Sequence, residues 1–213
     1  FMQFTLWSIK QTIAEVMPWF WGIYKWLSLS LPPIYYKIIN RIVFIAVAGF
    51  LLKTFFVIKE KDYKQLKTLI FLIWVPSIYF VTLTAWNYFF FSKNGFSFGI
   101  QGRYYFPVIV TIIAILIIGI SHLGEIIFKS FSKYVLLLLI YVMLVFNLAT
   151  LFHVSISYYD TSSLQTFITQ ASQYKPIIFK GNIIILIIMI ALSTQLVFVI
   201  KLFKFTIKNN ENL

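Results

Sequence analysis

The chain has 213 residues, of which 61% are hydrophobic and only 11% are charged. A soluble domain carries about 25% charged residues, so this composition excludes a water-soluble globular fold. The net charge of +12 would suggest nucleic acid binding in a soluble protein. Here the basic residues lie mostly in short segments between apolar runs, where the positive-inside rule and anionic lipid headgroups explain them. We therefore expect membrane lipids as partners, and no nucleic acid.

Metal and disulfide chemistry have no support in the sequence. The chain has no cysteine, which excludes a disulfide framework and a thiolate metal site. Its two histidines, His122 and His153, are far apart along the chain, so a histidine metal site is not expected. No cofactor is expected either.

Residues 1–35 are predicted to form an aromatic-rich interfacial segment outside the membrane core. Ser8 to Gln11 has the Ser-x-x-Gln form of a capping box, and apolar residues at helical spacing follow it. We expect a short amphipathic helix that ends at Pro18. The aromatic stretch that follows includes Trp21 and Trp26. It either forms an aromatic belt at the membrane interface or offers a stacking surface to a sugar or an isoprenoid chain.

Five apolar stretches approach or exceed the roughly 18 residues that indicate a membrane-spanning helix. The predicted spans are 36–58, 68–90, 104–120, 134–152 and 182–203. The fold class is therefore an all-α polytopic membrane bundle over residues 36–203. Residues 204–213 are expected to form a cytoplasmic tail.

The segment from Lys59 to Lys67 contains four lysines and is the strongest cytoplasmic signal in the chain. Alternation from it places the N-terminus outside, the C-terminus inside, and the loops 91–103 and 153–180 outside. A second interfacial helix is expected within 153–180, where apolar residues follow helical spacing. Its cap is expected at Thr161, Ser162 or Ser163. A second inner loop is expected to hold His122, Glu125, Lys129 and Lys133.

The segment Gln101–Tyr104 is the best candidate site. Gly95, Gly99 and Gly102 let the backbone turn and approach a ligand closely. Arg103 offers a planar fork suited to phosphate, at the depth where a lipid phosphate lies. The alternative is a flexible turn whose arginine anchors the helix at the headgroups.

A second basic group lies at the start of the first predicted span. Lys37, Asn40 and Arg41 share one helix face there. They are expected either to face an anionic headgroup or a substrate phosphate, or to snorkel to the interface.

Catalysis by this chain alone has little support. Only two of its six carboxylates, Glu15 and Asp160, fall in the expected outer segments, and neither has a second carboxylate nearby in the sequence. No Walker-type loop, nucleophile elbow or His-Glu-x-x-His motif occurs.

Two motifs resemble those of a family of bacterial polytopic membrane proteins. The sequence FWGIYKWLSLSLP, from Phe20 to Pro32, resembles the family's FWG-x-FGW…LP segment. The sequence QGRYYFP, from Gln101 to Pro107, resembles its QGRY-x-x-P signature. The family is the domain-of-unknown-function 2142 group, which is similar to the GT-C superfamily of membrane glycosyltransferases. Tyr24 and the lysine after it stand where the family usually has Phe-Gly.

The resemblance implies an enzyme that takes a sugar from a polyprenyl-phosphate carrier outside the cytoplasm, in cell-envelope glycan assembly. It implies supporting substrate contacts for Gln101, Arg103 and Tyr104, with Arg103 facing the carrier phosphate. The aromatic segment that includes Trp21 and Trp26 would line the same cavity. GT-C enzymes usually place a catalytic acidic residue after their first span. Because the resemblance covers only the C-terminal half of a typical member, that residue is expected outside this chain.

The alternative is a non-enzymatic membrane protein, such as a transporter or flippase subunit or a scaffold. A transporter is expected to carry ionisable residues near the middle of its spans. Lys53 is the nearest case, and its long side chain can snorkel to the interface.

Overall fold

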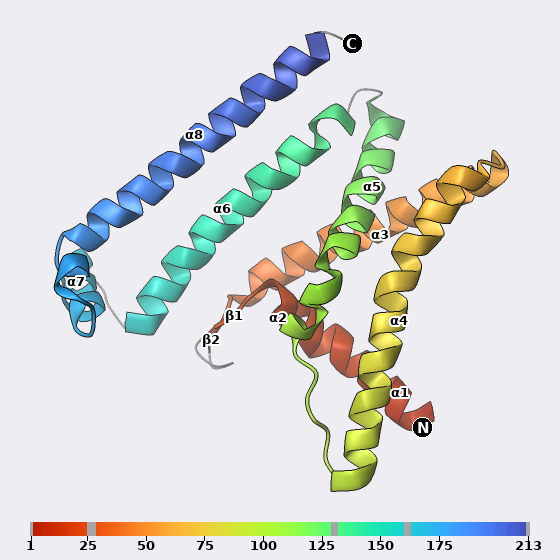
Figure 1. Cartoon of the computed structure of the whole chain (residues 1–213), viewed down its shortest axis with the longest axis horizontal. Coiled ribbons are helices and arrows are strands. Elements are labelled where there is room, and N and C mark those ends of the chain that lie inside the picture. Colours follow the sequence, from red (N-terminus) through yellow and green to blue (C-terminus); the bar gives the residue numbers. More distant parts are fainter. Residues whose placement is uncertain (1, 25–28, 129–131, 160–162, 212–213) are drawn as a thin grey trace. The chain divides into compact units, whose positions relative to one another are not determined.

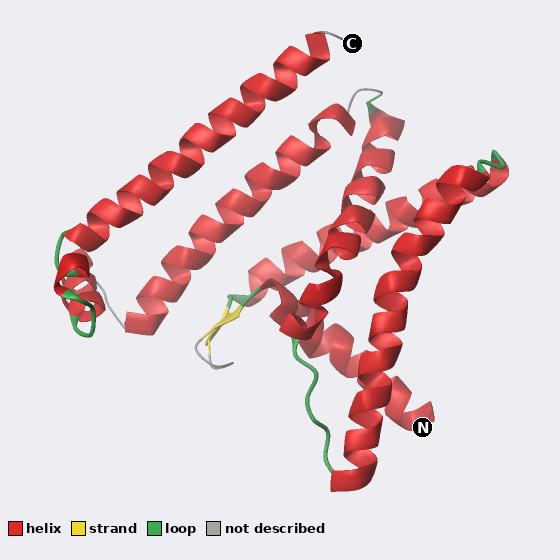
Figure 2. Cartoon of the chain, in the orientation of Figure 1, coloured by secondary structure: helices red, strands yellow, loops and turns green. Residues whose placement is uncertain are grey.

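The computed structural model describes residues 2–24, 29–128, 132–159 and 163–211. Within these residues the chain is almost entirely helical, and five helices are long and apolar enough to cross a membrane (Figure 1, Figure 2). The predicted all-α polytopic membrane fold is therefore confirmed, and the chain is an integral membrane protein. It divides into two units, Phe1–Ile23 with Ser30–Phe131, and Tyr24–Leu29 with Ser132–Leu213.

The first unit holds three of the five candidate spans. Its elements are α1 (Met2–Gln11), the π-helix η1 (Thr12–Val16), α2 (Met17–Trp21), α3 (Pro33–Lys59), α4 (Tyr63–Asn94), the 3-10 helix η2 (Gly102–Val108) and α5 (Ile109–Ile127). Two short strands, β1 (Ile23–Tyr24) and β2 (Leu29–Ser30), pair with each other between α2 and α3.

The second unit holds the other two candidate spans. Its helices are α6 (Ser132–Tyr159), α7 (Leu164–Ser172), the 3-10 helix η3 (Ile177–Phe179) and α8 (Ile183–Glu211). The helix predicted within 153–180 is α7, and Ser163 is the residue that caps it by accepting a hydrogen bond from the Thr166 N–H at 3.2 Å.

The N-terminal helix differs from its prediction at both ends. Ser8 lies inside α1 and is buried, so the predicted capping box is wrong. The helical path also continues past Pro18 to Trp21. The π-helical turn η1 ends two residues before the proline, with the Met17 N–H bonded to the Thr12 carbonyl. This wider turn shifts the backbone hydrogen-bond pattern next to proline, which has no N–H to donate, and the helical path continues beyond it.

The membrane helices extend beyond the apolar runs that predicted them. Helix α4 reaches Asn94, so the expected loop 91–103 narrows to 95–101. Helix α5 includes His122 and Glu125, which were expected in a loop. Backbone hydrogen bonds stabilise a helix equally well in the interface, so an apolar run marks the hydrocarbon and not the helix ends. The division at residues 35 and 203 into interfacial segment, bundle and tail stays a prediction.

The charged turn between α3 and α4 is shorter than predicted, since only residues 60–62 separate the two helices. Lys61 has a positive φ of 57°, and the Asp62 side chain caps α4 by accepting from the Gln65 N–H at 3.0 Å. The lysines at 64 and 67 therefore project from the first turns of α4.

Helices α3 and α5 cross at Gly49 and Gly119, where their backbones are in contact. A Cβ added at Gly119 would overlap backbone atoms of Ala46 and Phe50, and one added at Gly49 would overlap the Gly119 carbonyl. Small residues allow such close approach between membrane helices. Next to the crossing, a small core forms around Phe50, with Val57 and Leu69 also buried.

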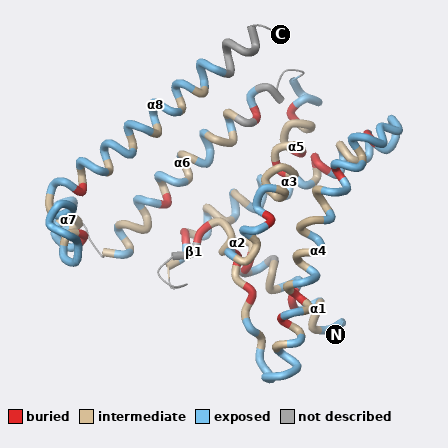
Figure 3. The backbone as a smooth tube through the Cα atoms, in the orientation of Figure 1, coloured by how far each residue is buried: buried red, intermediate tan, exposed pale blue. Residues whose placement is uncertain are grey.

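Elsewhere the spans expose most of their apolar side chains (Figure 3). Phe44, Trp74 and Phe89 are each more than half exposed. In a bilayer these side chains contact lipid, and the exposed surface needs no protein partner to be stable.

We predict that Gly119→Ala destabilises the first unit, because the added methyl group has no space at the crossing. Overpacking of this kind costs about 1–3 kcal/mol. The midpoint temperature of unfolding, measured on the purified protein in detergent, should fall. Ser121→Ala on the same helix is the control and should leave the midpoint unchanged. An unchanged midpoint in Gly119→Ala would contradict the backbone contact.

Candidate functional site

The segment 95–108 is held on the end of α4 by one buried amide. Asn87 is 0% exposed, and its Oδ1 accepts two hydrogen bonds, from the Ser97 hydroxyl at 3.1 Å and from the Phe98 N–H at 2.9 Å. The Gly99 N–H in turn donates to the Ser97 hydroxyl at 3.2 Å. Asn87 thus supplies the acceptor that the non-helical backbone needs at this depth.

Aromatic side chains of the same segment also pack against aromatic side chains of α4. Phe98 packs edge-on against Trp86 with 4.3 Å between ring centroids, and against Phe90 with 5.3 Å. Phe96 packs against Phe90 at 5.4 Å. These rings anchor the loop with edge-to-face contacts, which aromatic pairs prefer.

The three glycines of the segment have two different roles. Gly95 and Gly99 have φ values of 77° and 79°, which L-residues with side chains rarely adopt, and they turn the chain back toward η2. Gly102 is buried against the backbone of Trp19 and Phe20, where an added Cβ would overlap both residues. The sequence suggested that a ligand approaches the backbone at Gly102. In the structure it is the chain's own backbone, at Trp19 and Phe20, that lies there.

The aromatic segment that Gly102 contacts is itself tied to α3. The Tyr36 hydroxyl donates to the Gly22 carbonyl at 2.7 Å and accepts from the Leu31 N–H at 2.9 Å. One side chain of the first span thus fixes both ends of the connection from residue 22 to residue 31. Phe20 also packs edge-on against Phe106 of η2, with ring centroids 5.7 Å apart.

Two apolar spaces lie beside η2, one against each of two successive tyrosines. A cavity of about 120 Å³ is lined by Tyr105 together with Trp21 and Phe20 of α2, Val43 of α3 and residues of η1 and α5. A groove of about 320 Å³ is lined by Tyr104, Phe98 and three α4 residues, Tyr79, Leu83 and Trp86. Tyr104 and Tyr105 therefore each line a different aromatic-walled space.

The predicted site residues 101–104 lie together at this place. Tyr104 is half-buried and stacks near Phe98, with ring centroids 6.2 Å apart. Arg103 is exposed, with its guanidinium carbon 5.7 Å from the centroid of the Tyr104 ring. The Gln101 side-chain oxygen is buried and has no hydrogen-bond partner among the described residues. The arrangement offers an exposed cation and an unsatisfied acceptor beside apolar walls.

The other predicted site residues are placed differently. Trp21 is half-buried and lines the small cavity. Trp26 lies outside the described residues. Arg41 is exposed on α3, two positions before Val43, which lines the cavity. Residues two apart on a helix point to nearly opposite sides, so Arg41 faces away from this cavity. Its role in substrate binding stays a prediction.

The carboxylates expected on the outer side add little to this geometry. Glu15 lies in η1, and Asp160 lies outside the described residues. Over the described residues, no group of three or more His, Cys, Asp or Glu side chains is placed to hold a metal ion.

Asn87 is the site residue that sequence reasoning missed. Its only sequence signal is a lone amide within an apolar run, between Trp86 and Tyr88. Polar side chains are costly inside a membrane span and usually satisfy a specific partner, so this signal was available.

Comparison with known protein families, curated proteins and solved structures gave no match to this chain.

We predict that Asn87→Ala loosens the segment 95–101, because it leaves the Ser97 hydroxyl and the Phe98 N–H without their acceptor. Each buried unsatisfied group costs about 1–3 kcal/mol. Amide hydrogen exchange at residues 97–99 should accelerate. Asn94→Ala is the matched control, since Asn94 is exposed and its amide bonds only to the Phe90 carbonyl of its own helix. Equal protection in both variants would show that Asn87 does not anchor the segment.

Proposed function

We propose that this integral membrane protein is part of a GT-C-like glycosyltransferase that binds a polyprenyl-phosphate-linked sugar at the segment 95–108. The observation that carries the proposal is the backbone contact of Gly102 with Trp19 and Phe20. It joins the two motifs on which the family resemblance rests, although about 80 residues separate them in the sequence. Two motifs that build one site are better support than either alone.

The chemistry of the segment suits a lipid-linked phosphate. The aromatic groove beside Tyr104 offers apolar walls to the first isoprene units of the carrier. Exposed Arg103 next to it offers a charge-assisted, bidentate contact to the phosphate. The Gln101 side-chain oxygen is buried without a hydrogen-bond partner among the described residues, so a sugar hydroxyl could bond to it only after the segment shifts.

The chain's role in this proposal is to hold the carrier. Glycosyl transfer needs a carboxylate that acts as general base, and the segment 95–108 contains none. We therefore assign the reacting carboxylate to a residue outside the segment 95–108.

We place the segment 95–108 on the outer face of the cell membrane, with the C-terminus in the cytoplasm. The support is the group of lysines in and beside the turn between α3 and α4, at residues 59, 61, 64 and 67, which favours the cytoplasmic side. Helix α4 joins that turn to the segment, so the two lie at opposite ends of one span.

A second candidate, a transporter or flippase subunit, is favoured by one observation. His122 of α5 lies within electrostatic reach of Lys53, Glu125 and Glu60, and its Nε2 is buried without a hydrogen-bond partner among the described residues. Its ring packs against Phe56 at 5.6 Å. Ionisable groups inside a membrane mark ion pathways in many transporters.

The proposed topology is tested by reporter fusions at Lys64 and Gly95. Fusions at these two positions should report opposite sides of the membrane, with Gly95 outside. A cytoplasmic Gly95 would exclude contact with an externally presented carrier.

The proposed phosphate contact is tested by Arg103→Ala in nanodiscs, with a photoreactive polyprenyl phosphate as the probe. Loss of a hydrogen bond to a charged group costs about 1.5–3 kcal/mol, so binding should weaken by roughly 10-fold to 100-fold. Lys93→Ala removes an exposed cation from the last turn of α4 and is the control. Binding that is equal in both variants would leave Arg103 as an anchor for the helix and refute the contact.

A further inference from the structure

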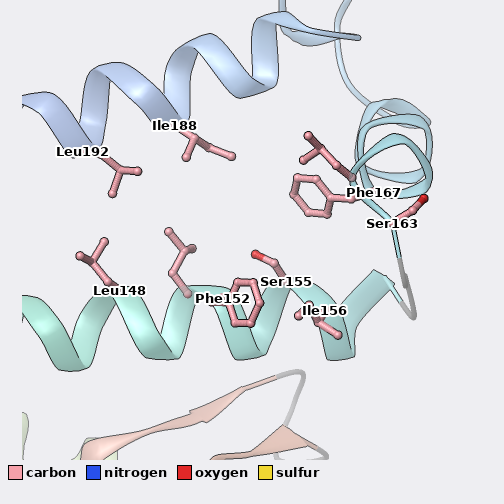
Figure 4. Close-up of a pocket in the computed structure, with 10 residues that line it drawn as sticks. Leu148, Phe152, Ser155, Ile156, Ser163, Phe167, Ile188 and Leu192 are labelled. Atoms are coloured by element: carbon pink, nitrogen blue, oxygen red, sulfur yellow. The ribbon is translucent and has the colours of Figure 1, made fainter.

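Helices α6, α7 and α8 enclose an apolar pocket of about 550 Å³ within the second unit (Figure 4). Figure 4 shows Leu148 and Phe152 of α6 facing Leu192 and Ile188 of α8 across an open space, with Phe167 of α7 at one end. The pocket volume falls within the range of about 300–1,000 Å³ that is typical of small-molecule sites.

The lining of the pocket selects an uncharged hydrocarbon. Among the described residues, Ser155 and Ser163 are the only polar ones that line it, and no charged one does. Protein interiors are close-packed and do not leave apolar spaces of this size empty. Because α6 and α8 are both candidate spans, the medium beside the pocket is the acyl-chain region of the bilayer.

The chain that joins α7 to α8 adds a cationic surface next to the pocket. The Gly181 N–H donates to the Ser172 hydroxyl at 2.8 Å, which folds residues 173–181 back onto the end of α7. Lys175 and Lys180 lie in this folded connection and are exposed.

The pocket lies near the end of α8 that follows this connection. Ile188, which lines the pocket, is five residues into α8, or about 8 Å along the helix axis. The segment 163–205, which contains the lysine pair, has no Asp or Glu. An apolar pocket next to a cationic surface matches a molecule with a hydrocarbon tail and an anionic head.

We propose that the second unit binds one anionic phospholipid, with an acyl chain in the pocket and the headgroup against Lys175 and Lys180. A phospholipid is the occupant because the bilayer supplies it at every moment and because it carries both required groups. The site is separate from the carrier site proposed for the first unit and does not depend on it.

The test uses the whole chain in nanodiscs made of equal parts phosphatidylglycerol and phosphatidylcholine. A trace of phosphatidylglycerol carries a photoreactive group on one acyl chain, and the labelled residues are identified by mass spectrometry. Labelling should concentrate on residues 148–156 and 188–192. Labelling spread evenly over the exposed faces of α6 and α8 would overturn the proposal.

Two pocket variants, Ile188→Trp and Leu192→Trp, fill the space and should each lower the pocket labelling severalfold. Ile190→Trp is the matched control, because Ile190 is on the same helix, is 55% exposed and does not line the pocket. Helical content measured by circular dichroism verifies that each variant folds. Labelling of 148–156 that persists in both folded pocket variants would contradict the proposal.

The headgroup contact is tested by Lys175→Gln combined with Lys180→Gln. The preference for labelled phosphatidylglycerol over labelled phosphatidylcholine should disappear in this variant. Lys201→Gln combined with Lys204→Gln changes the charge equally at the other end of α8 and should keep the preference. Displacement of the acyl label by an equal amount of polyprenyl phosphate would instead identify an isoprenoid occupant and refute the phospholipid. None of these results bears on the Arg103 experiment, which uses another unit and another probe.

Discussion

The hydrocarbon core of a bilayer offers no hydrogen bonds, and the first unit depends on how it meets that constraint. Backbone N–H and C=O groups within its helices bond to one another. The backbone between α4 and η2 is not helical, so its polar groups need other partners. Asn87 lies within a membrane span and supplies such a partner, because its Oδ1 accepts hydrogen bonds from the Ser97 hydroxyl and the Phe98 N–H. A single amide thereby permits an irregular polar segment at the end of an otherwise apolar helix pair.

The two units handle their apolar surface in different ways. In the first, backbones meet directly at glycine, at the α3–α5 crossing and at the contact between η2 and α2. Direct backbone contact leaves little room for lipid and suits a site whose polar groups must keep fixed positions. In the second, the helices enclose an apolar space lined by long side chains. A fluid hydrocarbon chain can adapt its shape to such a space. In our proposal a lipid chain fills the space between these helices, whereas glycine allows the helices of the first unit to contact each other directly.

The spans and the α7 helix were predictable because burial in lipid leaves a strong periodic or continuous apolar signal. Helix ends were not, since capping by Asp62 and continued backbone bonding to Asn94 depend on residues outside the apolar runs. The glycines and Arg103 indicated the candidate site in the sequence. The expected neighbour of Gly102 was a ligand, whereas the structure has the backbone of Trp19 and Phe20 there. A glycine shows that something comes close, and the sequence does not say whether it is a ligand or the chain itself. Asn87 was missed because its two partners lie ten and eleven residues away and belong to no regular repeat.

The span formed by η2 and α5 is held by backbone contact at both Gly102 and Gly119. The rises of a 3-10 helix and an α-helix place these contacts about 28 Å apart, nearly the thickness of the hydrocarbon core. A rod fixed at two such points cannot slide along its axis by even one residue without a collision at one of them. Arg103 directly follows the first of these points. The height of its Cα relative to α2 and α3 is therefore set by steric exclusion between backbones.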